Sequence, residues 1–116
     1  MIDRGRLKQL HQKEEARFLA RTPMSRERFN AAKEVMPGGV PMSWMTKWPG
    51  AYPLFVASAK GAHFVDVDWN EYIDLCLGDT GSMTGHSPAA TVKAIEEQLS
   101  RGMTAMLPTD DAVAVS

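Results

Sequence analysis

The stretch from Lys60 to Arg101 reads KGAHFVDVDWNEYIDLCLGDTGSMTGHSPAATVKAIEEQLSR, and it decides the expected fold. Side chains alternate between two faces over 63–68, which predicts a half-buried strand because a β-strand has a side-chain period of two. Asp and Asn in 68–71 favour a turn, since both bond to their own backbone. The alternation resumes over 72–75, so the pattern predicts a β-hairpin.

A loop of small residues follows this hairpin and leads into a helix. Ser87 would cap the helix and Pro88 would take its first position, where no backbone donor is lost. Gly102 would end the helix. The expected apolar face repeats at i, i+3 and i+7, through Val92, Ile95 and Leu99.

The residues before this stretch predict two helices. The first covers 3–20, is rich in charge and has a narrow apolar stripe. The second is capped by Thr22 or Ser25 and ends at Pro37, which lacks the backbone donor that a helix needs. Its apolar line is formed by Phe29, Ala32 and Met36.

An irregular loop over 40–52 then carries two tryptophans, Trp44 and Trp48, which we expect to pack against other groups. Residues 54–57 predict a short strand that a turn over 58–61 joins to the hairpin. The three strands would form an antiparallel sheet. We expect three segments: N-terminal helices over 1–36, a loop and sheet over 37–87, and a helix with a further helical start over 88–116.

Composition limits the classes of function. The chain has 116 residues and would bury roughly two-thirds of its unfolded surface if it folded compactly. The single cysteine excludes an internal disulfide. No apolar run reaches the ~20 residues of a membrane helix, and the N-terminus lacks the apolar region of a signal peptide. The sequence therefore predicts a cytoplasmic protein without a membrane partner.

The net charge of −1 is unevenly distributed. Residues 1–36 carry nine basic and five acidic side chains, while residues 37–116 carry four and nine. A basic arm for nucleic acid is one interpretation of this asymmetry. A solvated helix face explains it more simply, so we expect no nucleic-acid partner.

Two motifs resemble the N-terminal region of class III aminotransferases, the fold-type I enzymes that depend on pyridoxal phosphate. One is GAHFVDVDWNEYIDL followed by GH and a helix, and the other is AAKEVMPGGV at 31–40. The resemblance runs over 25–116 and is greatest to glutamate-1-semialdehyde aminomutase and β-amino-acid aminotransferases. It implies an α+β fragment, with N-terminal helices, a small three-stranded antiparallel sheet and a following helix, of an α/β fold-type I transferase.

The resemblance also implies the chemistry of a longer parent enzyme. That enzyme would use pyridoxal phosphate to move an amino group between a small-molecule amino donor and a carbonyl acceptor, as a homodimer. The last helix, over 108–116, opens at Thr109 and stops after barely two turns, so we expect a truncated chain. No lysine here falls at the family's Schiff-base position, so we expect no transaminase activity from this chain alone. The alternative is a stand-alone interaction module derived from the same N-terminus.

The resemblance implies that two loops line the substrate pocket, through Met42, Ser43, Trp44, Asp79 and Thr80. Met42 stands where an arginine can bind a substrate carboxylate in β-amino-acid aminotransferases, so that recognition is not expected here. Trp44 would offer an apolar wall, or simply fill the space under its loop. Asp79 stands where the aminomutase has an aromatic. It would orient a substrate amine or hydroxyl, or cap its own loop.

The remaining sequence patterns give weaker evidence of function. Residues 66–70 imitate the opening of a calcium loop, but Glu71 and Leu77 replace the glycine and the acid that such a loop needs. The three histidines have no metal-ligand spacing, and the resemblance gives His86 a structural role in its loop. Trp69 stands where the family usually has Gly, so we expect Asn70 to adopt the left-handed conformation. The glycines after residue 77 are poorly spaced for a phosphate-binding loop.

Overall fold

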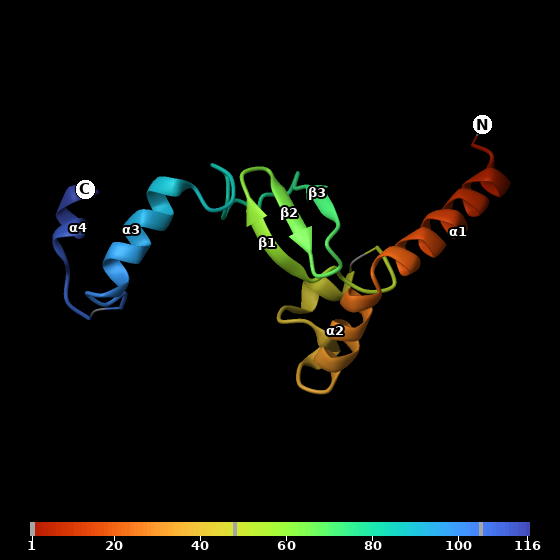
Figure 1. The fold of residues 1–116 in the computed structure, drawn as a ribbon, viewed down its shortest axis with the longest axis horizontal. Coiled ribbons are helices and arrows are strands. Elements are labelled where there is room, and N and C mark those ends of the chain that lie inside the picture. The colour runs from red at the N-terminus through yellow and green to blue at the C-terminus, as the bar shows by residue number, and fades with distance from the viewer. Residues whose placement is uncertain (1, 48, 105) are drawn as a thin grey trace.

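The computed structural model describes residues 2–47, 49–104 and 106–116, and the chain in it is elongated (Figure 1). A sheet occupies the middle, the first helix projects to one side, and the last two helices lie on the other. In chain order the elements are α1 (Arg4–Arg21), α2 (Pro23–Lys33), the 3-10 turns η1 (Pro37–Gly39) and η2 (Ser43–Lys47), β1 (Val56–Lys60), β2 (His63–Asp66), β3 (Glu71–Ile73), α3 (Ala89–Leu99) and α4 (Asp110–Ala114).

The three-stranded antiparallel sheet confirms the prediction, with strand order β1-β2-β3. The bounds of its first strand were wrong, because β1 includes the residues expected to form a turn. Ala59 pairs with Phe64, and Phe64 in turn pairs with Tyr72. The reversal needs only two residues, since Gly61 supplies a positive φ of 57° and lets the strands continue up to it.

The turn between β2 and β3 also differs from the expectation. Trp69, not Asn70, takes the left-handed conformation, with φ of 63°. Asn70 is held by its own hydrogen bonds, because its backbone N–H and its side-chain amide both donate to Asp66. The left-handed position therefore falls on Trp69, whose side chain is 80% exposed.

The two N-terminal helices form as expected, but the side chain that caps α2 comes from a distant part of the chain. Thr22 occupies the N-cap position of α2, yet its hydroxyl donates to the carbonyl of Phe18 at 2.7 Å. The carboxylate of Asp68 caps the helix instead, accepting the N–H groups of Met24 at 2.6 Å and Ser25 at 2.9 Å. A side chain from the hairpin turn thus fixes the start of α2. Neither of the two expected local caps, Thr22 and Ser25, has this role.

Helix α3 starts one residue later than predicted. Ser87 has a φ of 49° and its hydroxyl donates to the carbonyl of Ala59 at 3.2 Å, so it does not cap the helix. Pro88 takes the N-cap position. The predicted apolar face exists, but its members Val92, Ile95 and Leu99 are 38%, 43% and 60% exposed.

The buried core is small. Its apolar members are Ala32, Val40 and Tyr52, and Tyr52 packs against Phe18 with ring centroids 5.0 Å apart. The radius of gyration is 19.5 Å, against about 13 Å for a compact domain of this length. The surface of 9811 Å² is roughly half that of an unfolded chain of this mass, so the chain buries less than the expected two-thirds.

The expectation that both loop tryptophans would pack is wrong for Trp44, which is 57% exposed, while Trp48 lies outside the described residues. Large apolar side chains of α3, α4 and the segment between them are also exposed. Within the described residues, no helix is both long and apolar enough to cross a membrane.

Candidate functional site

A buried carboxylate organises the hairpin turn. Asp66 is fully buried, and its Oδ1 accepts the backbone N–H groups of Asp68 at 2.9 Å and Asn70 at 2.8 Å. Its Oδ2 accepts the hydroxyl of Tyr72 at 2.9 Å. Burial and this hydrogen bond raise the pKa of Tyr72 to about 12, because both favour the neutral phenol.

The same turn is tied to the first helix. The side-chain oxygen of Asn70 accepts Arg21 Nη2 at 2.9 Å, while its Nδ2 donates to the Arg21 carbonyl at 3.0 Å. Burial acts to raise the pKa of Asp68, but the hydrogen bonds from Met24 and Ser25 outweigh it and hold that pKa below its usual value. The acids that imitate a calcium loop are therefore occupied by N–H and O–H donors. Among the described residues, no cluster of His, Cys, Asp or Glu could hold a metal ion.

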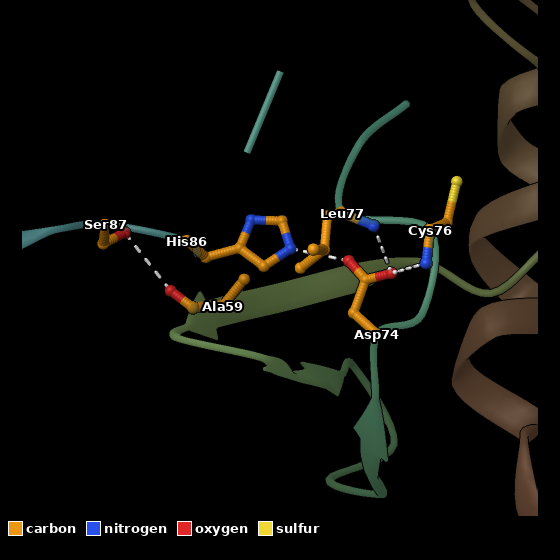
Figure 2. Close-up of polar contacts among 6 residues, drawn as sticks. All are labelled: Ala59, Asp74, Cys76, Leu77, His86 and Ser87. Carbon is orange, nitrogen blue, oxygen red and sulfur yellow. Dashed lines mark hydrogen bonds and ion pairs between the residues drawn. The ribbon is translucent and has the colours of Figure 1, made fainter. Parts of the chain in front are cut away.

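The loop over 75–85 is anchored at its start by Asp74 (Figure 2). Asp74 Oδ1 accepts the backbone N–H groups of Cys76 and Leu77, both at 2.9 Å. Its Oδ2 lies 2.6 Å from Nε2 of His86, at the end of the same loop. The hydrogen bond from His86, together with those of the two amides, holds the pKa of Asp74 below its usual value.

The end of the loop is fixed to the turn between β1 and β2. His86 and Gly61 exchange two backbone hydrogen bonds, of 2.8 and 2.9 Å. Gly85, with φ of 93°, packs so closely that a Cβ there would lie 3.1 Å from the Cα of Gly61. The structural role expected for His86 thus has a geometric basis. The sequence analysis did not identify Asp74. A signal was present, because an Asp side chain in a turn often bonds to the backbone of the residues that follow it.

Between these anchors the backbone forms a left-handed turn. Leu77, Gly78, Asp79 and Thr80 have consecutive φ values of 51°, 62°, 50° and 78°. Left-handed helical backbone costs about 1–2 kcal/mol for each residue that has a Cβ, and three of these four do. Ser82 donates its N–H to the Leu77 carbonyl at 2.9 Å and closes the turn. Strain of this kind persists only when surrounding contacts impose it.

The turn presents two of the expected site residues to solvent. Asp79 and Thr80 are both exposed. The carboxylate of Asp79 accepts no hydrogen bond from any of the described residues, and the loop amides bond to Asp74 instead. The capping role considered for Asp79 is therefore performed by Asp74, which leaves Asp79 open to another group.

The first expected loop lies elsewhere. Met42, Ser43 and Trp44 enter the turn η2, which packs against η1, and Met42 is 50% exposed. The backbone carbonyls of Met42 and Ser43 accept hydrogen bonds from Met45 and Thr46, which close the turn. Figure 1 places this loop below the sheet beside α2, and the loop after β3 at the upper end of the sheet. A single copy of the chain does not bring the two loops together.

A further cleft lies in a third place. Its volume is about 600 Å³, and it lies between α1 and one face of the sheet. Its lining is mainly apolar and includes Phe18, Leu54, Phe64, Tyr72 and Ile73. None of the five expected site residues lines this cleft.

The lysines do not fit a covalent site for pyridoxal phosphate. A lysine that forms a Schiff base works in a desolvated pocket, where its pKa is lowered. All six lysines here are exposed. Two of them have polar partners on their own helices, Lys33 with Asn30 and Lys93 with Glu97.

Comparison with known proteins finds relatives that this chain matches over only part of their length. No family model matches. The chain is 40% identical over 86 residues to the glutamate-1-semialdehyde 2,1-aminomutase of Methanosarcina acetivorans, a match that covers 74% of this chain and 20% of the relative. The chain thus spans about a fifth of the length of the curated relatives it matches.

Solved structures give the same result. A glutamate-1-semialdehyde aminomutase from Pseudomonas aeruginosa, also solved in complex with PMP, superposes with a TM-score of 0.91 and 39% identity over 98% of this chain and 25% of its own. A β-phenylalanine aminotransferase from Variovorax paradoxus superposes with a TM-score of 0.77 and 26% identity, over 88% of this chain and 23% of its own.

Proposed function

Since this chain belongs to the class III, fold-type I family of pyridoxal-phosphate-dependent aminotransferases and matches only part of their length, we propose that it forms the N-terminal part of such an enzyme. The complete enzyme would transfer an amino group between an amine or amino acid and a carbonyl compound. The observation that carries this proposal is the superposition of nearly the whole chain on an aminomutase.

The contribution of this part would be recognition of the substrate. Asp79 and Thr80 would contact the substrate from the loop after β3, because the Asp79 carboxylate is exposed and is not used by its own loop. A carboxylate at this point favours a substrate with an amine or a hydroxyl and disfavours one with a second carboxylate. Met42, Ser43 and Trp44 would supply a mostly apolar wall, with Met42 in place of a carboxylate-binding arginine.

The complete enzyme would be a homodimer. The two candidate loops lie at opposite ends of the sheet in one copy, so a pocket that uses both would need them from different copies. The exposed apolar side chains of α3 and α4 would be covered by the rest of the enzyme, since exposed apolar surface often marks an interface. The match of nearly the whole chain to one part of an aminomutase favours this proposal over a stand-alone interaction module.

Pyridoxal phosphate would be bound covalently by a lysine outside this chain, because the lysines here are exposed. The cofactor supplies an electron sink for the amino-group transfer when bound. The test is to purify the complete protein and this chain separately, add the cofactor, and follow the visible absorbance of the lysine-bound form. We expect the complete protein to show it and the chain alone to lack it. A stoichiometric signal from the chain, abolished by mutating one of its lysines, would contradict the proposal.

The role of Asp79 has its own test. In the complete enzyme, Asp79→Ala should change the preference among amino donors by about tenfold, the effect of losing one charged contact. It should leave the melting temperature almost unchanged, since no described group bonds to that carboxylate. A large loss of melting temperature with unchanged kinetics would show that Asp79 stabilises the loop.

A further inference from the structure

The carboxylate of Asp74 joins the two ends of the loop that carries Asp79 and Thr80. Figure 2 shows one of its oxygens facing the amides of Cys76 and Leu77 and the other facing the imidazole of His86. The first contacts set the backbone direction at the point where the loop leaves the sheet. The second, at 2.6 Å, fixes where the loop returns.

Both partners are themselves held by the sheet. Asp74 donates its N–H to the Ala62 carbonyl at 2.8 Å, and His86 exchanges two hydrogen bonds with Gly61. The side chains of the pair are largely enclosed, with 14% of Asp74 and 19% of His86 exposed. Water therefore competes weakly for this contact, and the pair forms a rigid base for the turn.

The turn on this base is one that its sequence does not favour. Leu77, Asp79 and Thr80 hold left-handed φ values that non-glycine residues rarely adopt. The leucine and the two polar residues therefore need an external constraint, and Asp74 bonds to the amide of the first of them.

We propose that Asp74 and His86 are positioning residues that hold the turn from Leu77 to Thr80 in its left-handed form and thereby place Asp79 and Thr80 against the substrate. This inference rests on the proposed function for the substrate contact, but the anchoring of the turn is independent of it. The pair touches no substrate itself. It acts by setting the direction of the backbone that carries Asp79 and Thr80.

The test uses three variants of the complete enzyme: His86→Ala, His86→Gln and the control His63→Ala. Glutamine carries an N–H donor at the place of Nε2, so it should preserve the contact. His63 also pairs with a carboxylate, that of Glu71 at 3.1 Å, but lies on β2 outside this loop and half exposed. Amide hydrogen exchange over 75–85 is measured together with kcat and KM for a donor with a hydroxyl and for one without.

We expect His86→Ala to accelerate exchange in the loop and to reduce the preference between the two donors by up to about tenfold, the effect of losing the contact that the loop would place. His86→Gln should restore both, and His63→Ala should change neither. Unchanged exchange in His86→Ala would overturn the proposal. The proposal would also be overturned if Asp79→Ala alters the preference between the two donors and His86→Ala leaves that preference unchanged.

A third outcome separates the two proposals. If His86→Ala frees the loop while Asp79→Ala leaves the donor preference unchanged, the pair anchors the turn as inferred and the substrate contact proposed for Asp79 is wrong. Stability alone does not decide the matter. A purely structural pair would lower the melting temperature in His86→Ala without shifting the ratio of kcat/KM between the donors.

Discussion

Removing the hydroxyl of Tyr72 tests how strongly the buried Asp66 carboxylate holds the hairpin. Tyr72→Phe keeps the ring, which stacks on Phe64 with centroids 4.9 Å apart, and deletes only the donor to Asp66 Oδ2. The pKa of Tyr72 rises from 10.0 to about 12. Burial is the largest cause of this shift and it penalises the phenolate without stabilising the neutral side chain, so the loss in Tyr72→Phe is sized by the hydrogen bond to the charged Asp66, ~1.5–3 kcal/mol. We expect Tyr72→Phe to lower the unfolding free energy by an amount near the lower end of this range, because the ring is only partly buried.

The pH dependence follows from the direction of the shift. A raised pKa means that the fold favours the neutral phenol, so this stabilisation is fully present below pH 10 and is lost as the pH rises to about 12. The difference in unfolding free energy between the wild type and Tyr72→Phe should therefore shrink over that interval.

The assay exploits the small number of tyrosines. The chain has two, so Tyr52→Phe leaves Tyr72 as the only source of tyrosinate absorbance. A spectroscopic titration of that variant should give a pKa well above 10, and urea unfolding at several pH values should give the free-energy difference. Ionisation of Tyr72 near 10, or a difference that does not change between pH 10 and 12, would refute the argument.

Two further substitutions test contacts between segments. Asp68→Ala should lower the unfolding free energy by about 1 kcal/mol, since it removes the cap of α2; Asp111→Ala, at an exposed site, is the control, and equal losses in urea unfolding would contradict the capping role. Gly85→Ala should cost more than Gly102→Ala, although the two glycines have nearly equal φ values of 93° and 94°. The added Cβ would meet the backbone of Gly61 only in the first case, so equal melting temperatures would show that this contact is unimportant.

The sequence predicted the elements that depend on local patterns. Alternation over 63–68 and 72–75 predicted the hairpin, and the helix expected over 3–20 is observed as α1, although its cap by Asp3, whose Oδ1 accepts the Arg6 N–H at 3.0 Å, was not predicted. These features follow from periodicity and from side chains that reach their own backbone. The family resemblance rested on the same hairpin and on the PGG segment.

The features that sequence reasoning missed depend on contacts between distant residues. No local pattern shows that Asp68 would cap a helix more than forty positions earlier, or that Ser87 would bond to Ala59 and leave the cap of α3 to Pro88. Trp69 adopts the left-handed conformation because Asn70 is already bonded to Asp66 and Arg21. The substrate contacts of Met42, Ser43, Trp44, Asp79 and Thr80 remain predictions.

The close approach of Gly85 to Gly61 has a consequence for protein engineering. Exchanging the segment after β3 between relatives is an obvious route to altered donor selectivity. A transplanted segment would fit only if it has a glycine at the position of Gly85, because a Cβ there would lie 3.1 Å from the Cα of Gly61. Gly85 therefore has to move with the segment, while the approach itself leaves room for a Cβ at Gly61.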